Sequence, residues 1–241
     1  MKMRVLSMLL ALTLVCCAVI PAGSLTANAS DTTPANGIAY EDVPEGAWFY
    51  DAIAYMTANG YMIGMSETHF RPEGVLTRGQ FVTILHRLEG APDIVYSDRF
   101  SDVPENQWYT NAILWAEENG IVKGYNDNTF GVTDLITREQ MVVMMHRFAS
   151  DYKGLNLEGN TELSEFSDSA QVSGYAVEAI GWAVFNGLIQ GSADPTGVKL
   201  LPSASANRAQ CAAIIQRFME KLEHIDSTDP KEDELPMIPV V

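Results

Sequence analysis

An internal repeat with a period of sixty residues is the feature that most constrains the fold of this chain. Trp48 and Arg78 return as Trp108 and Arg138, and an Asp-Val-Pro triplet, an Asn-Gly pair and a His-Arg pair return at the same offset. A third copy, which includes Arg208, is more divergent and carries additional loop residues. A unit of this size cannot bury an apolar face alone, so the copies are expected to pack on one another.

Each copy predicts two helices joined by a loop. The first helix ends at Asn-Gly in every copy, where Gly can adopt the left-handed conformation that closes a helix; the three are expected at 49–58, 109–118 and 175–185. The second carries an apolar stripe spaced i, i+3, i+4, i+7, in copy one Phe81, Ile84, Leu85 and Leu88. Together they predict a mainly helical, all-α fold, with the three second helices around a common axis in a pseudo-threefold bundle.

The copies also define the domain organisation. They are expected at residues 40–89, 100–150 and 166–219. Phe70 and Phe130 are expected to pin the loops of the first two copies to the core. Cys211 takes the position of a large apolar residue in the third stripe, so it is expected to be buried. The segment 224–241 is rich in Asp, Glu and Pro, which predicts a disordered acidic tail.

The first residues have the order of a secretory signal peptide. Two basic residues precede an apolar run, and a small-residue stretch ends at Ala29. This order predicts a signal peptide at 1–29 and a short linker at 30–39. A retained membrane anchor and a lipoprotein modified at Cys16 or Cys17 are the alternatives. Cleavage would leave Cys211 as the remaining cysteine, so no intramolecular disulfide is expected in the exported chain.

Acidic residues set the electrostatic character of the chain. Its formal net charge is −16, and removal of the predicted signal peptide would take two basic residues away. Such a surface repels nucleic acid and anionic membranes at long range. An anionic ligand would therefore need a few well-placed cations that act against the overall field.

A capping box precedes each apolar stripe. Thr77, Thr137 or Asn207 is followed three residues later by Gln, and the two side chains are expected to satisfy backbone N–H groups at the helix start. For these residues a structural role is a sufficient interpretation.

An arginine follows each capping residue at the first helical position. These residues are Arg78, Arg138 and Arg208. The helix dipole disfavours a cation there by about 0.3–1 kcal/mol, so a compensating partner is expected. One candidate is an ion pair with Asp42, Asp102 or Asp168. Another is an anionic ligand gripped by the guanidinium together with free helix N–H groups. In a third arrangement the aspartate orients the arginine and both face a ligand.

Aromatic residues stand near the start of each first helix. Trp48 and Trp108 occupy this position in the first two copies and Tyr175 in the third. Such rings either close the edge of the core or offer a stacking face to a sugar ring. The arginines late in the second helices, Arg87, Arg147 and Arg217, suit the negative end of the dipole and are interpreted as structural.

Catalytic and metal-binding patterns are weak. Asp127-Asn128 lacks the alternating oxygen ligands and terminal Glu of a calcium loop, so no metal or cofactor is predicted. His86 and His146 share one helical position, while His69 and His224 lie elsewhere, and no nucleophile with a base recurs. The chain is therefore not expected to be an enzyme.

The ordered motifs of copy two closely resemble the S-layer homology repeat. They are Phe100–Pro104, Trp108, Asn119–Ile121, Gly124–Tyr125, Asn128–Phe130 and Ile136–Glu139. Copy one matches most of these elements. Copy three departs at Asn207, Ser169–Ala170 and Tyr175, so a weaker groove is expected there. The resemblance covers about residues 40–219 and implies a three-pronged pseudo-trimer with grooves between neighbouring repeats.

The resemblance also implies a function and a set of site residues. Members of the family attach non-covalently to secondary cell-wall polysaccharide, commonly with pyruvylated amino sugars, in the bacterial envelope. The implied ligand-binding residues are Arg78, Arg138, Arg208, Asp42, Asp102, Asp168, Trp48, Trp108, Gly64, Gly124 and Gly191. We therefore expect a secreted cell-surface protein whose partner is this polysaccharide. The alternative is an assembly subunit that contacts other surface-layer proteins.

Overall fold

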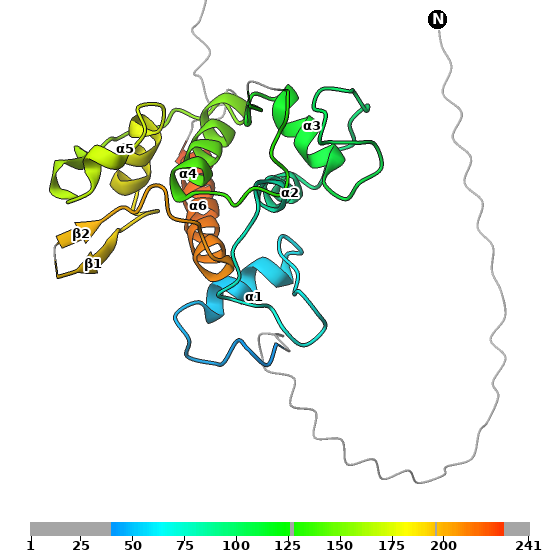
Figure 1. Cartoon of the computed structure of the whole chain (residues 1–241). Coiled ribbons are helices and arrows are strands. Elements are labelled where there is room, and N and C mark those ends of the chain that lie inside the picture. Colours follow the sequence, from blue (N-terminus) through cyan, green and yellow to red (C-terminus); the bar gives the residue numbers. More distant parts are fainter. Residues whose placement is uncertain (1–39, 126–127, 196, 229–241) are drawn as a thin grey trace, which may run out of the picture. The chain divides into compact units, whose positions relative to one another are not determined.

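The computed structural model describes residues 40–125, 128–195 and 197–228. The predicted signal peptide and linker lie outside these residues, as does the predicted tail from residue 229 onward. The α-helices are α1 (Tyr50–Ala58), α2 (Arg78–Leu88), α3 (Thr110–Glu118), α4 (Arg138–Arg147), α5 (Val177–Phe185) and α6 (Arg208–Thr228) (Figure 1). The described part is therefore mainly helical, and each predicted helix is present within two residues of its expected start.

Shorter elements lie in the connections. A π-helical turn, η1 (Phe148–Tyr152), continues α4, and two 3-10 turns follow at η2 (Leu163–Glu165) and η3 (Ser169–Gln171). The antiparallel strands β1 (Ser192–Asp194) and β2 (Gly197–Lys199) form a small hairpin in the loop of the third repeat. The sequence did not predict this hairpin, which accommodates the additional residues of that loop. Helix α6 continues to Thr228, past the expected start of the tail.

Capping boxes start the three second helices, as predicted. The Thr77 hydroxyl accepts the Gln80 N–H at 3.3 Å, and the side-chain Oε1 atom of Gln80 accepts the Thr77 N–H at 3.0 Å. The Thr137 and Asn207 boxes have the same reciprocal bonds. All three helices consequently begin at their arginine.

Helices of different repeats pack together as pairs. Helix α3 contacts α2, α5 contacts α4, and α1 contacts α6. The first helix of each repeat thus packs against the second helix of the preceding repeat, and α1 of the first repeat completes the cycle on α6 of the third (Figure 1). The sequence pattern does not reveal this exchange. A helix has the same apolar spacing whether it packs within its own repeat or on a neighbouring repeat.

Short extended segments before the second helices bond to one another in the same cyclic order. The Ile136 N–H donates to the Leu76 carbonyl at 3.0 Å, the Leu76 N–H to Ala206 at 3.3 Å, and the Ala206 N–H to Ile136 at 3.3 Å. Each of these three residues is buried. The repeats are therefore joined by a closed ring of backbone hydrogen bonds.

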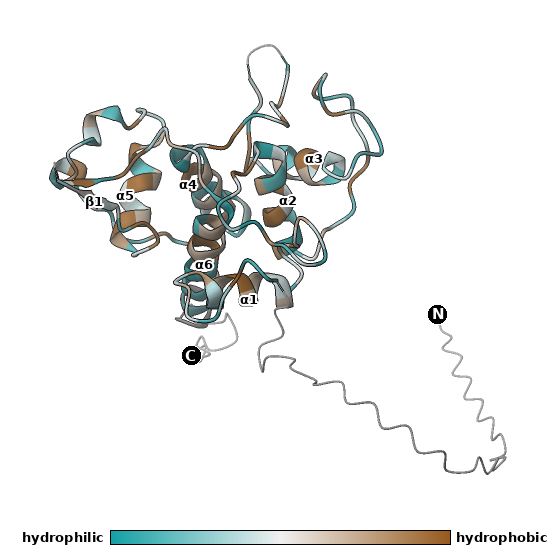
Figure 2. Ribbon diagram, turned by 60° about the horizontal axis from the view of Figure 1, so that its bottom comes forward, coloured by the Kyte–Doolittle hydropathy of each residue, from teal (hydrophilic) through white to brown (hydrophobic). Residues whose placement is uncertain are grey.

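One continuous hydrophobic core spans the three repeats. Its largest buried side chains include Phe70, Phe81, Phe130, Phe148, Trp182 and Phe218. Phe70 and Phe130 are fully buried, which confirms that they hold their loops to the core, and Cys211 is also fully buried as predicted. Figure 2 shows the apolar and polar stretches that alternate along α2, α4 and α6. Within the described residues, no helix combines the length and hydropathy needed to cross a membrane.

Candidate functional site

The first N–H groups of each second helix have no partner within their own helix, but they are bonded to other parts of the protein. The N–H groups of Arg78 and Gly79 donate to the carbonyls of Asp134 and Val132, at 2.8 and 3.1 Å. The third N–H, from Gln80, donates to the capping Thr77. Helices α4 and α6 have equivalent bonds to carbonyls of another repeat. The expectation that these N–H groups join an arginine in gripping a ligand is therefore wrong.

The arginine side chains reach across to the loop of the next repeat. The Nε atom of Arg78 donates to the Phe130 carbonyl at 3.1 Å, and that of Arg208 donates to the Phe70 carbonyl at 2.9 Å. Arg138 does the same to the Leu200 carbonyl at 2.9 Å. The guanidiniums of Arg78 and Arg208 also lie over the rings of Phe130 and Phe70, with centroid distances of 4.7 and 4.2 Å. Each arginine thereby joins two repeats.

The aspartates hold the same loops from the other side. Asp42 accepts the N–H groups of Phe70 and Arg71 at 2.8 and 2.7 Å. Asp168 is buried and accepts two equivalent N–H groups. Asp102 accepts three, at 2.7–3.2 Å. Burial raises the pKa of Asp102, but these backbone bonds outweigh it and hold the pKa below its ordinary value.

Arginine and aspartate act on one shared residue and form no direct ion pair. Among the described residues, no salt bridge joins any of the three arginines to an aspartate. Instead, the N–H of Phe130 donates to Asp102 while its carbonyl accepts from Arg78. Phe70 links Asp42 to Arg208 in the same way, and Leu200 links Asp168 to Arg138. The ion-pair alternative is thus replaced by an indirect connection through the backbone.

Three equivalent grooves lie beside these connections. Each groove is numbered after the repeat that supplies its loop and its second helix. Groove 1 has a volume of about 360 Å³, groove 2 about 390 Å³ and groove 3 about 290 Å³. Groove 1 is lined by Gly64, Gln80, Arg87, Trp108 and Arg208 among others. Groove 2 is lined by Gly124, Gln140, Arg147, Tyr175 and Arg78, and groove 3 by Gly191, Gln210, Arg217, Trp48 and Arg138.

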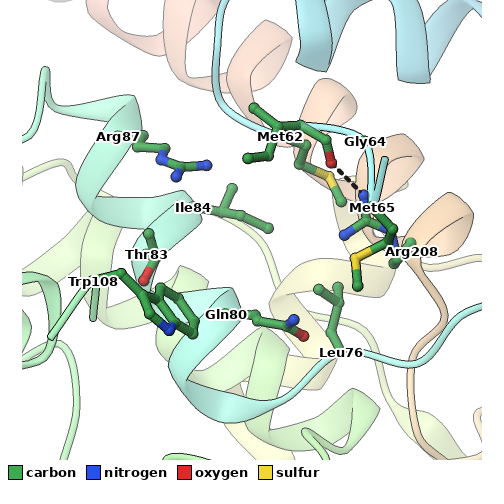
Figure 3. Close-up of a pocket in the computed structure, with 11 residues that line it drawn as sticks. Met62, Gly64, Met65, Leu76, Gln80, Thr83, Ile84, Arg87, Trp108 and Arg208 are labelled. Carbon is green, nitrogen blue, oxygen red and sulfur yellow. Dashed lines mark hydrogen bonds between the residues drawn. The ribbon is translucent and has the colours of Figure 1, made fainter. Parts of the chain in front are cut away.

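Each groove takes residues from all three repeats. In groove 1 the loop and helix α2 belong to the first repeat, Trp108 to the second and Arg208 to the third. Figure 3 shows Arg208 and Trp108 on different sides of this groove, with Gln80 and Ile84 of α2 between them. The structure therefore brings together the predicted arginine, glycine and aromatic residues, but in sets that cross the repeat boundaries. The predicted aspartates line none of the three grooves and are bonded to the loop backbone.

The aromatic rings of the grooves are exposed. Trp48 is 63% exposed, Trp108 61% and Tyr175 57%. Of the two alternatives for these rings, a place at the edge of the core is therefore wrong. Trp48 and Trp108 each make an edge contact with the following aromatic residue, at 5.3 and 5.1 Å between ring centroids. That contact fixes the ring position while it leaves a broad face accessible.

The groove glycines are required by close packing of the loop. A Cβ atom on Gly64 would lie 2.5 Å from the Tyr40 ring, and one on Gly124 would overlap the Phe100 ring. On Gly191, which has φ of +76°, it would lie 2.6 Å from Val198. The glycine thus allows close packing of the groove wall against the opening aromatic residue in the first two repeats and against Val198 in the third.

Arg138 is the most exposed of the three arginine residues and has the fewest hydrogen bonds within the described part of the chain. Arg78 and Arg208 are buried, and their Nη2 atoms donate to the Lys123 and Ile63 carbonyls at 3.3 and 2.6 Å. Arg138 is half-buried and forms, within the described residues, the Nε bond alone. Burial lowers the pKa of all three arginines, yet an arginine stays charged in proteins. Arg138 thus has donors left for a ligand in groove 3.

Sequence reasoning missed several residues of the grooves. Gln80, Gln140 and Gln210 line them in addition to capping their helices. Arg87, Arg147 and Arg217 also line them, although they were assigned a purely structural role. The i+7 spacing from Gln to Arg was a usable signal, since it places both on one face of the helix.

Glu139 is another residue that the sequence did not single out. This carboxylate is 6% exposed and accepts hydrogen bonds from the N–H and hydroxyl of Ser173, at 3.1 and 2.8 Å, and from the Tyr175 hydroxyl at 3.0 Å. Burial and the Glu139 contact together raise the pKa of Tyr175. Glu139 thereby fixes the aromatic residue of groove 2.

Comparison with known proteins agrees with this geometry. The family model for the S-layer homology domain matches residues 39–82 and 99–142. The chain carries S-layer homology domains. The two matched segments cover the first two repeats, from the opening aromatic residue to the start of the second helix. The third repeat shares the same capping box, arginine and aspartate bonds.

Relatives carry the aligned segment within much longer proteins. The chain is 32% identical over 210 residues to an amylopullulanase of Thermoanaerobacterium thermosulfurigenes, which aligns with 84% of this chain. It is 28% identical to the surface-layer 125 kDa protein of Lysinibacillus sphaericus and to the S-layer protein sap of Bacillus anthracis, which align with 93% and 80% of this chain. The aligned parts span 11%, 17% and 23% of the three relatives.

These findings establish the general role of the chain. S-layer homology domains anchor surface proteins to the cell wall, so the chain contains an anchoring module and belongs at the cell surface. Within the described residues, no group of three or more His, Cys, Asp or Glu side chains is placed to hold a metal ion.

Proposed function

We propose that the chain binds secondary cell-wall polysaccharide non-covalently, and that the three grooves hold acidic, pyruvylated amino-sugar units of this polymer. The observation that carries the proposal is the repeated combination of a guanidinium, an exposed aromatic ring and a glycine-backed loop in every groove. The combination suits a ring-shaped ligand with a carboxylate. The pairings of α1 with α6, α3 with α2 and α5 with α4 also support the three-pronged pseudo-trimer expected of the family.

The arginines of the grooves favour binding of a carboxylate although the chain as a whole is acidic. The chain has a net charge of −16, yet each groove is lined by two arginines. One is at the start of a second helix, and the other is nine residues after the start of a different second helix. Guanidinium groups bind carboxylates through paired, charge-assisted hydrogen bonds. The ketal-linked pyruvate of an amino sugar presents such a carboxylate. The exposed ring of Trp48 or Trp108 then provides a flat apolar face for the sugar.

Groove 3 is the groove in which a carboxylate is expected to bind most tightly. Its arginine, Arg138, has free donors, its second arginine, Arg217, is exposed, and its ring, Trp48, is accessible. In groove 1 the Nη2 atom of Arg208 is bonded to the Ile63 carbonyl, and the guanidinium of Arg87 lines the same groove (Figure 3). In groove 2 the ring is Tyr175, bonded to Glu139, and Lys123 adds a cation.

Sedimentation with cell walls tests the anchoring role. The purified chain is expected to co-sediment with sacculi that retain their polysaccharide, and to remain in solution with sacculi from which it has been removed. Equal retention on bare peptidoglycan would contradict the proposal. Sedimentation of the chain by itself, through self-association, would favour the alternative of an assembly subunit.

Substitution of the groove tryptophans tests the site. Trp48→Ala and Trp108→Ala are each expected to weaken binding of a soluble pyruvylated amino sugar to their groove by about tenfold, equivalent to about 1.4 kcal/mol, because each removes a stacking face. Both rings are more than half exposed, so the melting temperature should change little. Phe185→Ala is a matched control, since Phe185 is 57% exposed and lines none of the three grooves. Unchanged calorimetric affinity in both tryptophan variants would contradict binding in grooves 1 and 3.

A further inference from the structure

A second cavity adjoins groove 1 behind Trp108. Its volume is about 630 Å³, within the range of about 300–1,000 Å³ typical of ligand pockets. Thr83, Arg87 and Trp108 line both this cavity and groove 1. The two hollows are therefore neighbouring parts of one cleft, with the indole of Trp108 at their boundary.

The second cavity is built from polar but mostly uncharged groups. Helix α2 supplies His86 and Arg87, and the extended connection after it supplies Tyr96. The turn before α3 supplies Asn106 and Gln107, and α3 itself supplies Asn111. Groove 1, by contrast, is lined by the apolar side chains of Met62, Ile63, Met65, Leu76 and Ile84 beside its two arginines. Amide and hydroxyl groups match the hydroxyls of a neutral sugar, and the carboxylate of Glu105 at this cavity would repel an anion.

The turn before α3 is more polar than its counterpart in the first repeat. Asn106 and Gln107 stand where the first repeat has Gly46 and Ala47. Asn106 has φ of +63°, a left-handed conformation that glycine adopts more readily, as Gly46 does at +83°. Asparagine is one of the few residues besides glycine that adopts this conformation readily, so the turn keeps its backbone shape while the side chain brings an amide to the cavity.

The turn is also held rigidly. The Thr110 hydroxyl donates to the Pro104 carbonyl at 2.7 Å and accepts the Gln107 N–H at 3.0 Å. Thr110 is buried. The backbone of Gln107, next to Trp108, is therefore fixed before any ligand arrives, which reduces the entropy lost on binding.

We propose that groove 1 and the cavity behind Trp108 together bind two consecutive sugar units, an acidic unit in the groove and a neutral, hydroxyl-rich unit in the cavity. Arg87 and Trp108 contact both units, and Asn106 and Gln107 recognise the neutral one. This inference rests on the proposed binding of polysaccharide in the grooves. It makes groove 1 a site for a stretch of the polymer chain, with a preference for oligosaccharides over single sugars.

Affinities for fragments of different length test the inference. Cell-wall polysaccharide is cut into fragments of one sugar and of two to three sugars, separated by size and titrated calorimetrically into a Trp48→Ala background, which weakens groove 3. The chain is expected to bind the longer fragments about tenfold more tightly than the single sugar. The variant N106G/Q107A, which installs the residues of the first repeat, should lose this advantage and keep its affinity for the acidic single sugar.

The outcomes separate this inference from the proposed function. Glu45→Gln in the first repeat is the control, since this exposed residue lines neither hollow. Equal affinity for short and long fragments, or a length advantage that survives in N106G/Q107A, would overturn the extended cleft while polysaccharide binding stands. Absence of binding by fragments of every length, and by intact polysaccharide, would instead remove the proposed function itself.

Discussion

At the scale of single residues, one peptide unit joins opposite charges that never touch. The peptide unit between Phe130 and Gly131 accepts from Arg78 through its carbonyl and donates its N–H to Asp102. The Phe70–Arg71 and Leu200–Leu201 units are used in the same way. A carboxylate on the N–H side and a guanidinium on the carbonyl side polarise the unit in the same direction, which strengthens both hydrogen bonds. The arginine therefore finds compensation for its place at a helix start in the loop of the next repeat.

Asp102→Asn is expected to destabilise the chain in a pH-dependent way. An amide cannot accept all three N–H bonds, so the free energy of unfolding at pH 7 should fall by about 1–3 kcal/mol. The pKa of Asp102 is held below its ordinary value in the folded chain. Its stabilisation is therefore present above about pH 4 and is lost as the pH falls through the lowered pKa, so the variant and the parent should converge in acid.

Urea unfolding followed by circular dichroism at pH 7, 5 and 3.5 measures this convergence. Asp98→Asn is the control, because Asp98 is an exposed residue of the extended connection after α2. A difference between Asp102→Asn and the parent that stays constant down to pH 3.5 would contradict the assigned role of the carboxylate.

At the scale of elements, the helices were predictable and their partners were not. The apolar spacing and the capping residues placed α2, α4 and α6 correctly, since both are local properties of the chain. The exchange of first helices between repeats depends on loop paths, which the spacing does not encode. For the same reason the sequence did not indicate which aspartate acts with which arginine, whereas the structure groups Arg78 with Asp102 and Arg208 with Asp42.

The prediction of the site was limited in the same way. The residue types around Trp48, Arg138 and Gly191 were identified from their repetition, and they do line one groove. Their division between three repeats could not be read from a linear pattern. Glu139 escaped notice because Gly79 and Ala209 replace it in the other copies, so repetition carried no signal.

Glu139 connects α4 to the turn before α5, and its removal should loosen that contact. Glu139→Ala is expected to lower the free energy of unfolding by about 1.5–3 kcal/mol, the range for hydrogen bonds to a charged group. Part of this loss comes from the Tyr175 hydroxyl, so a double-mutant cycle with Tyr175→Phe should give a coupling of about 0.5 kcal/mol or more. Thermal unfolding gives all four stabilities. Additive effects of the two substitutions would show that the contact contributes nothing.

At the scale of the whole molecule, cyclic pairing makes the three repeats interdependent. A linear array of repeats keeps most of its contacts when a terminal unit is removed, because each unit contacts its neighbours in sequence only. Here α1 packs on α6, and Leu76 donates its N–H to Ala206 of the third repeat. Loss of the third repeat therefore exposes the apolar face of the first and opens the backbone ring.

A fragment of residues 33–150, which lacks the third repeat, is accordingly expected not to fold cooperatively. Ile53 and Met56 of α1, both fully buried in the complete chain, would lose the surface of α6 against which their helix packs. We expect weak near-ultraviolet circular dichroism and binding of a hydrophobic dye, because specific packing is lost while local helices persist. Adding the complementary fragment 151–241 should restore a cooperative transition, since it supplies α6 and the missing segment of the ring. A fragment 33–150 that unfolds as sharply as the complete chain would show instead that the first two repeats form an autonomous unit, and that closure through α1 and α6 contributes little.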